Sequence, residues 1–162
     1  MVGGIADMVP VANEFRVIVR SALKVMNGAG TMPVGIAALL RVAGAEPPYR
    51  AEVSGFTISP RINAAGRIGD AAPALALLTT DDPAEAAELA TLLEGINLER
   101  KELTKVAIDE ARALLGLVPG SVRDDTRAYL GDGLVAVRGP WSVGLIGLIG
   151  RASCRERVYV LV

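Results

Sequence analysis

Apolar residues recur every three or four positions in three short segments of the chain. This spacing predicts helices over residues 13–27, 33–42 and 71–78. Asp70 stands where a side chain can cap the third helix, and Pro33 stands in the first turn of the second, where its missing N–H costs nothing. The first part of the chain is therefore expected to be largely helical.

The longest periodic segment runs from residue 84 to residue 115. Asp82, Pro83 and Glu85 form a strong helix start, with an N-cap, a proline at the first helical position and a glutamate that closes a capping box. At 1.5 Å per residue this helix is roughly 48 Å long. A domain of this size cannot bury so long a helix, so we expect it to connect two bodies, with a polar linker over 121–126 after it.

The remaining segments lack clear helical spacing. Residues 134–137 predict a strand, and residues 143–150 predict a turn that enters a tightly packed helix. Residues 2–10 are interpreted as a buried strand end or turn, and residues 59–70 as turns around a short helix, because glycines stand where loops need them. The expected fold class is α/β, mixed and helix-rich, in which the first strand is the edge of a parallel sheet.

The composition narrows the possible chemistry. The 162 residues include no histidine and one cysteine, which excludes a Ser-His-Asp or Cys-His catalytic unit, a histidine-containing metal site, a CxxC pair and a disulfide framework. The formal net charge is −1, so the chain as a whole does not attract nucleic acid or anionic membrane. No apolar run is long enough to span a bilayer and no secretory signal is recognisable, so we expect a cytoplasmic protein that does not bind membranes.

Asp7 is the first candidate functional residue. It stands among apolar neighbours, where a carboxylate requires a partner, a capping role or a metal ion to offset its desolvation. Capping a turn or pairing with an arginine is the more common outcome. Because Mg²⁺ and Mn²⁺ need several oxygen ligands, Asp7 alone does not make a metal site.

Arg61, Asn63 and Arg67 form the second candidate site. Two guanidinium groups and an amide lie close together in the sequence and could bind a phosphate on one surface. In the alternative interpretation, Arg61 and Arg67 pair with Glu52 and Asp70 and only hold a loop in place. The spacing does not decide between these two interpretations.

Other reactive residue types favour structural roles. Trp141 is typical of a packed side chain, and Cys154 has no partner residues with which to form a site. The acidic residues along the predicted long helix are typical of a solvated face and are not interpreted as an acid and base pair: Glu85, Glu88, Glu94, Glu99, Glu102, Asp109 and Glu110.

Three segments, in this order, resemble the RecJ family of the DHH phosphoesterase superfamily: Gly3-Gly4-Ile5-Ala6-Asp7-Met8-Val9-Pro10, Pro60-Arg61-Ile62-Asn63-Ala64-Ala65-Gly66-Arg67-Ile68-Gly69-Asp70, and Asn97-Leu98-Glu99-Arg100. The resemblance runs from about residue 1 to about residue 150, and the second segment is its most specific part.

The resemblance implies a 5′-to-3′ exonuclease that hydrolyses phosphodiesters of single-stranded DNA in recombination and repair, with Mn²⁺ or Mg²⁺ as the cofactor. Asp7 matches a catalytic, metal-binding carboxylate of the family. Arg61, Asn63 and Arg67 match the segment that binds the DNA substrate. The resemblance also divides the chain into three parts: the C-terminal part of a DHH-type catalytic domain over 1–80, a connector helix over 81–120, and the start of a second, DHHA1-type domain over 121–162.

The sequence also departs from the family pattern. The Asp-His-His motif that names the superfamily is missing, and no histidine is present to complete a metal site. We therefore expect an internal fragment that has no hydrolytic activity alone. Residues after about 149 resemble a translated sequencing adapter, and the alternative is a helix end followed by a strand over 158–162. Two other functions remain open: a non-catalytic scaffold or binding module of the superfamily, and a phosphodiesterase that acts on oligonucleotides or nucleotides.

Overall fold

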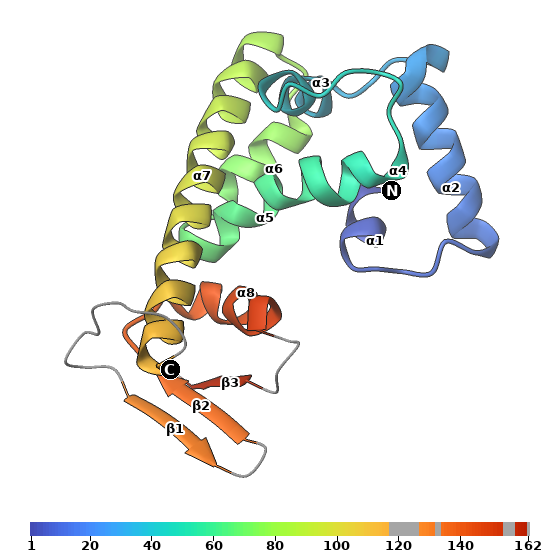
Figure 1. The fold of residues 1–162 in the computed structure, drawn as a ribbon. Helices are drawn as coiled ribbons and strands as arrows, with labels where there is room; N and C mark the ends of the chain where they lie inside the picture. Colours follow the sequence, from blue (N-terminus) through green and yellow to red (C-terminus); the bar gives the residue numbers. More distant parts are fainter. Residues whose placement is uncertain (117–126, 132–133, 154–157, 162) are drawn as a thin grey trace. The chain divides into compact units, whose positions relative to one another are not determined.

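The structure, a computed structural model, describes residues 1–116, 127–131, 134–153 and 158–161. They form two compact units, Met1–Asn97 and Leu98–Val162, and the boundary between the units falls inside the longest helix. Figure 1 shows the elements of each unit, and each unit is described by itself below. The functional parts expected over 1–80, 81–120 and 121–162 remain predictions.

The first unit is made of helices, and residues 1–97 contain no strand. The predicted helices over 13–27, 33–42 and 71–78 are confirmed. The elements, including two π-helical turns, are α1 (Val2–Ala6), α2 (Asn13–Lys24), η1 (Val25–Ala29), α3 (Val34–Val42), α4 (Ala51–Val53), η2 (Ser54–Ile58), α5 (Ser59–Ile68), α6 (Ala72–Thr79) and the first part of α7 (Pro83–Leu114).

The strand end predicted within residues 2–10 is wrong, because this segment begins with the short helix α1. Gly4 lies against the aromatic ring of Phe15, and a Cβ atom at Gly4 would come within 2.5 Å of that ring. The glycine therefore allows α1 to pack closely against α2. The sequence pattern alone did not distinguish α1 from a turn. The expected edge of a parallel sheet is not present in this unit, whose residues are all described.

Of the turns around a short helix predicted over 59–70, the short helix is confirmed as α5, whereas turns within 59–68 are wrong, because α4, η2 and α5 form one continuous helical segment over 51–68. A charged residue occupies one of its core-facing positions, so the apolar period is interrupted in the sequence although the helix is not. The six buried residues of this segment follow the spacing of a helix: Ser54, Ile58, Ser59, Arg61, Ala64 and Ala65.

The core of the first unit is built by α3, η2, α6 and α7. Its most deeply buried large side chains are each at most 2% exposed: Leu39, Leu40, Ile58, Leu77 and Leu93. Helices α3 and α6 approach so closely that a Cβ atom at Gly35 would lie 1.9 Å from the carbonyl oxygen of Leu77. Because of this approach, only glycine fits at position 35 without a movement of the backbone.

The predicted cap of α7 is confirmed, because Asp82 accepts a hydrogen bond through Oδ1 from the backbone N–H of Ala84 at 2.9 Å. Asp70 likewise accepts a hydrogen bond through Oδ1 from the N–H of Ala72 at 2.9 Å, but the N-cap residue of α6 is Ala71, so Asp70 precedes the cap by one residue. Glu85 differs from the predicted capping box, because its carboxylate accepts a hydrogen bond from the hydroxyl of Thr80. The backbone N–H of Asp82 donates to the same Thr80 hydroxyl at 3.1 Å, so this threonine completes the cap.

The second unit combines the end of α7 with a small sheet. Its strands are β1 (Arg127–Gly131), β2 (Leu134–Arg138) and β3 (Val158–Leu161), in the order β1-β2-β3, and α8 (Val143–Ser153) connects β2 to β3. β1 runs antiparallel to β2, and β3 runs parallel to it. The predicted strand over 134–137 and the helix that follows it are thus observed. The alternative of a strand over 158–162 is observed over residues 158–161, the part of it that the structure describes. The linker expected over 121–126 lies outside the described residues.

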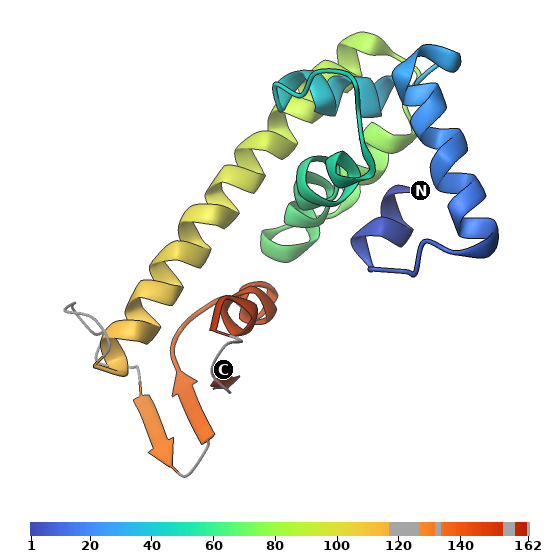
Figure 2. The same cartoon turned by 45° about the vertical axis from the view of Figure 1, so that its right-hand side comes forward.

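The predicted 84–115 helix is confirmed as α7, which is a single helix of 32 residues (Figure 2). In the second unit, α7 holds Trp141, whose indole Nε1 donates a hydrogen bond to Glu110 Oε2 at 2.7 Å. Trp141 is 6% exposed. Its structural role is therefore confirmed, while Glu110 is a partner of the tryptophan and not part of a fully solvated face.

Within the described residues, no single helix has the length and apolar character needed to cross a membrane. The segments Asn13–Ala29 and Val34–Val42 meet these criteria only as a pair, and they are bent by 74° relative to each other.

Candidate functional site

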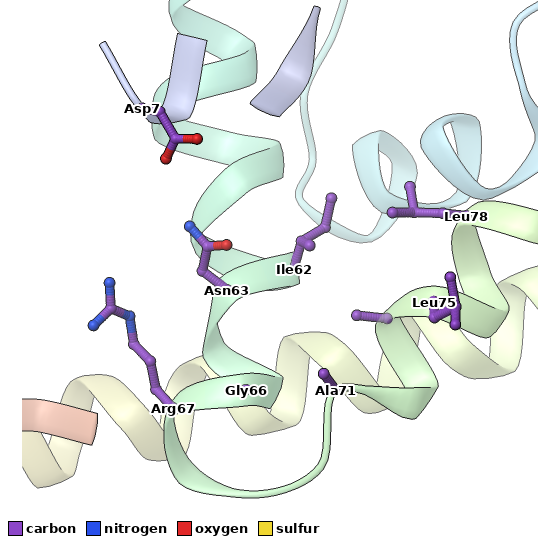
Figure 3. Close-up of a pocket in the computed structure, with 9 residues that line it drawn as sticks. Asp7, Ile62, Asn63, Gly66, Arg67, Ala71, Leu75 and Leu78 are labelled. Atoms are coloured by element: carbon purple, nitrogen blue, oxygen red, sulfur yellow. The ribbon is translucent and has the colours of Figure 1, made fainter. Parts of the chain in front are cut away.

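An open pocket of about 580 Å³ lies in the first unit, between the end of α1, the helix α5 and the helix α6 (Figure 3). Three of the four sequence-predicted site residues line it. The full lining is Asp7, Ile62, Asn63, Gly66, Arg67, Ala71, Ala74, Leu75 and Leu78.

Asp7 reaches the pocket because α1 packs against the helical segment over 51–68. Its backbone N–H donates to the carbonyl of Gly3 at 2.9 Å, so the residue directly follows the helix end. Its side chain is exposed. The desolvation on which the sequence interpretation rested is therefore absent, and in Figure 3 the carboxylate stands at one end of the polar edge of the pocket.

Asn63 and Arg67 lie four residues apart on α5, which places them one turn apart on the same face of the helix. Asn63 is exposed, and Arg67 is half-buried. Figure 3 shows Asp7, Asn63 and Arg67 in succession along one side of the pocket. The folded chain thus brings together a carboxylate and a guanidinium group that are 60 residues apart in the sequence.

Arg61 is not part of this pocket. Its guanidinium forms an ion pair through Nε with Glu94 Oε2 of α7, and the two side chains are only 11% and 20% exposed. Its Nη1 also donates to the carbonyl oxygen of Thr57 at 2.7 Å. The alternative of a structural ion pair therefore describes Arg61 correctly, but the partner is Glu94 and not Glu52.

The interpretation of Glu94 as one of the solvated carboxylates of the long helix is wrong. Its side chain faces α5 and is largely removed from water. The signal that could have identified it is its position on α7, because Ala90, Leu93 and Asn97 are buried around it at helical spacing.

The residues of the pocket do not by themselves fit a Mn²⁺ or Mg²⁺ ion. Asp7 is the one carboxylate in its lining. Such hard ions require several oxygen ligands. Among the residues that the structure describes, no group of three or more His, Cys, Asp or Glu side chains could hold a metal ion.

Sequence reasoning missed the leucine side of the pocket. Leu75 and Leu78 of α6 line it and are 64% and 46% exposed. The sequence carried one signal for this surface, because α6 is apolar on every face. An all-round apolar helix is normally buried on all sides. Here Ala74 and Leu77 fill the core, while Leu75 and Leu78 remain at the surface of the unit.

Curated RecJ proteins match nearly the whole chain. The chain is 32% identical over 149 residues to the single-stranded-DNA-specific exonuclease RecJ of Bacillus subtilis, covering 91% of this chain and 18% of that protein. It is 34% identical over 158 residues to RecJ of Escherichia coli, covering 97% of this chain and 26% of that protein. The chain thus spans about a fifth to a quarter of the length of these relatives. No protein-family model matches it.

Solved structures agree with the sequence matches. Crystal structures of RecJ from Thermus thermophilus in complex with Mn²⁺ and with Mg²⁺ superpose on the chain with TM-scores of 0.78 and 0.77, at 29% and 30% identity. Each covers 99% of this chain, which corresponds to 23% and 24% of the solved chains. The chain is therefore homologous to the RecJ single-stranded-DNA exonucleases over most of its length and corresponds to a fragment of such a protein.

Proposed function

We propose that this chain contributes a single-strand-binding surface to a metal-dependent 5′-to-3′ exonuclease, which hydrolyses phosphodiesters of DNA during recombination and repair in the cytoplasm. The observation that carries the proposal is the shared pocket of Asp7, Asn63 and Arg67. These residues come from two of the segments that resemble RecJ, and the chain is homologous to RecJ on both sides of them.

The chemistry of the polar edge suits a phosphodiester. The Arg67 guanidinium and the Asn63 amide can both donate hydrogen bonds to phosphate oxygens. Asp7 carries a negative charge that repels a phosphate, so the phosphate is held at the arginine end of the edge. Asp7 supplies one carboxylate for Mn²⁺ or Mg²⁺, and the other ligands must come from residues outside this chain.

Arg61 serves the same surface indirectly. Its ion pair with Glu94 attaches α5 to α7 on the side of α5 that faces the core. The attachment fixes the rotation of α5, which decides where Asn63 and Arg67 point. We therefore assign Arg61 a positioning role and not a direct contact with DNA.

Binding of fluorescently labelled DNA to the complete 162-residue chain tests the proposal. At low ionic strength, fluorescence anisotropy is expected to show tighter binding of a single-stranded oligonucleotide than of a duplex of the same sequence. No hydrolysis is expected with Mn²⁺, because no group of three or more His, Cys, Asp or Glu side chains in the part of the chain that the structure describes could hold the ion. Equal binding of both forms would contradict the single-strand preference, and no binding would contradict the DNA-binding assignment and would favour a scaffold role within the same superfamily.

A further inference from the structure

The pocket of the first unit has two chemically different sides. Asp7, Asn63 and Arg67 form the polar edge, and α6 forms the opposite wall (Figure 3). The leucine wall, defined as Leu75 and Leu78, carries only aliphatic groups. A ligand that fills this pocket must therefore be polar on one side and apolar on the other.

The leucine wall is exposed to solvent. Leu75 is 64% exposed and Leu78 is 46% exposed. Leu78 also lines a smaller neighbouring pocket of about 170 Å³, together with Ile62 and Asn63. The apolar surface thus continues past the first pocket and meets the polar edge again at Asn63. Covering such a surface removes apolar area from water, which favours binding.

We propose that the leucine wall receives the base of one nucleotide of single-stranded DNA while Asn63 and Arg67 hold the adjacent phosphate. This inference rests on the proposed function and adds to it the part of the pocket that contacts the base. A nucleotide has the required polar side and apolar side, because its phosphate is charged and the faces of its base are largely apolar. Apolar side chains that contact base faces bind every base, since each base has such a face.

The charges of the pocket argue against a purely apolar occupant. An apolar segment of a protein laid into the pocket would remove Asp7 and Arg67 from water without offering either of them a hydrogen bond. A nucleotide supplies acceptor oxygens to the arginine and leaves the carboxylate end open to solvent. Leucine side chains form no hydrogen bonds with base edges, so the wall contributes affinity without sequence specificity.

The wall is tested in the complete chain with two ligands of equal charge, oligo-dT and an abasic oligonucleotide with the same number of phosphates. The parent chain is expected to bind oligo-dT about fivefold to tenfold more tightly than the abasic ligand, which corresponds to the low end of the free energy that one base contributes by stacking. Leu75→Ser combined with Leu78→Ser is expected to remove this preference and to leave the affinity for the abasic ligand unchanged.

Leu92→Ser is the matched control. Leu92 is 48% exposed on α7, close to the exposure of Leu78, and it lies outside both pockets. This variant is expected to keep the preference for oligo-dT. Circular dichroism melting of all variants separates a local effect from a loss of folding.

The outcomes distinguish this inference from the proposed function. If the parent chain binds both ligands equally, the leucine wall does not contact bases, although the phosphate-binding surface stands. If the combined substitution of Leu75 and Leu78 weakens the binding of both ligands to the same extent, the leucine wall affects binding by supporting the fold and not by contacting the base, and the inference fails. If the parent chain binds neither ligand at low ionic strength, both the proposed function and the leucine wall are overturned.

Discussion

Arg61 and Glu94 form a largely buried ion pair that joins α5 to α7. A guanidinium in the segment that most closely resembles a DNA-binding motif therefore faces the core of the unit. The pair leaves the opposite face of α5 to Asn63 and Arg67, which line the pocket.

Removal of one partner of this pair is expected to destabilise the first unit. Arg61→Ala leaves the Glu94 carboxylate largely out of water without its cation, which costs about 3 kcal/mol in the free energy of unfolding. Urea unfolding followed by circular dichroism measures the loss. The double variant Arg61→Met with Glu94→Met removes both charges and is expected to recover most of the stability. An Arg61→Ala variant that unfolds like the parent but binds DNA poorly would instead make Arg61 a direct DNA contact.

The helices of the first unit were predictable where burial follows an apolar period. α2, α3, α6 and α7 satisfy this condition, and Asp70 and Asp82 mark helix starts through local hydrogen bonds. The full extent of α5 was not predicted because Arg61 occupies a core-facing position, and only its tertiary partner Glu94 makes that burial possible. The spacing of residues along the sequence does not reveal which residue pairs with Arg61 in the folded protein.

The site was predictable in its residue types but not in its geometry. Asp7 and Arg67 lie in one pocket because α1 packs on the segment over 51–68. Gly4 lets the same short helix lie against Phe15 of α2. This close approach of distant segments depends on tertiary structure. The sequence motif also grouped Arg61 with Arg67, although six residues along a helix place two side chains on different faces.

Arg67 is expected to contribute an electrostatic part of DNA binding. Arg67→Ala should weaken binding of single-stranded DNA and reduce the slope of log K against log salt by about one, because one phosphate contact is lost. Anisotropy titrations between about 50 and 200 mM salt, the range over which such contacts are sensitive, measure the slope. Arg41→Ala is the matched control, since Arg41 is exposed on α3 outside the pocket. An unchanged slope for Arg67→Ala would remove this residue from the DNA-binding surface.

Substitution by alanine at Gly35 and at Gly95 should change the stability of the protein in opposite directions. A Cβ atom at Gly35 would overlap the carbonyl oxygen of Leu77, so Gly35→Ala must separate α3 from α6 and is expected to cost about 3 kcal/mol or more. Gly95 has no atom within 4 Å of the added Cβ, and Gly95→Ala is expected to gain up to about 1 kcal/mol from helix propensity. Thermal unfolding of both variants measures the difference. Equal melting temperatures would contradict the packing of α3 on α6.

The hydrogen bond between Trp141 and Glu110 gives the second unit a spectroscopic reporter, because the chain contains one tryptophan. Glu110→Ala leaves the buried indole N–H without its acceptor and is expected to cost about 1–3 kcal/mol. The tryptophan emission should shift to longer wavelength as water reaches the ring. Glu102→Ala, an exposed change on the same helix, should leave emission and stability unaltered. Emission from Glu110→Ala that matches the parent would show that the indole needs no acceptor there.

Asp7 is expected to be required for hydrolysis once the other metal ligands are supplied. A chimera of Escherichia coli RecJ in which this chain replaces its matching segment is expected to supply those ligands, and the two sequences are 34% identical over 158 residues. In that chimera, Asp7→Ala is expected to lower Mn²⁺-dependent cleavage of single-stranded DNA at least about a hundredfold, because an oxygen ligand of the ion is lost. Folding should change little, since Asp7 is exposed and its backbone N–H bond to Gly3 is retained.

The control for this experiment is Asp81→Ala, which removes an exposed carboxylate outside the pocket and is expected to leave cleavage at the level of the chimera. DNA binding measured without metal should be unchanged or tighter in Asp7→Ala, because the variant removes a negative charge from beside the phosphate. Loss of cleavage with retained binding would therefore separate a ligand role from a structural one. Cleavage by Asp7→Ala at the rate of the unmodified chimera would remove Asp7 from the catalytic centre and leave the pocket as a binding surface alone.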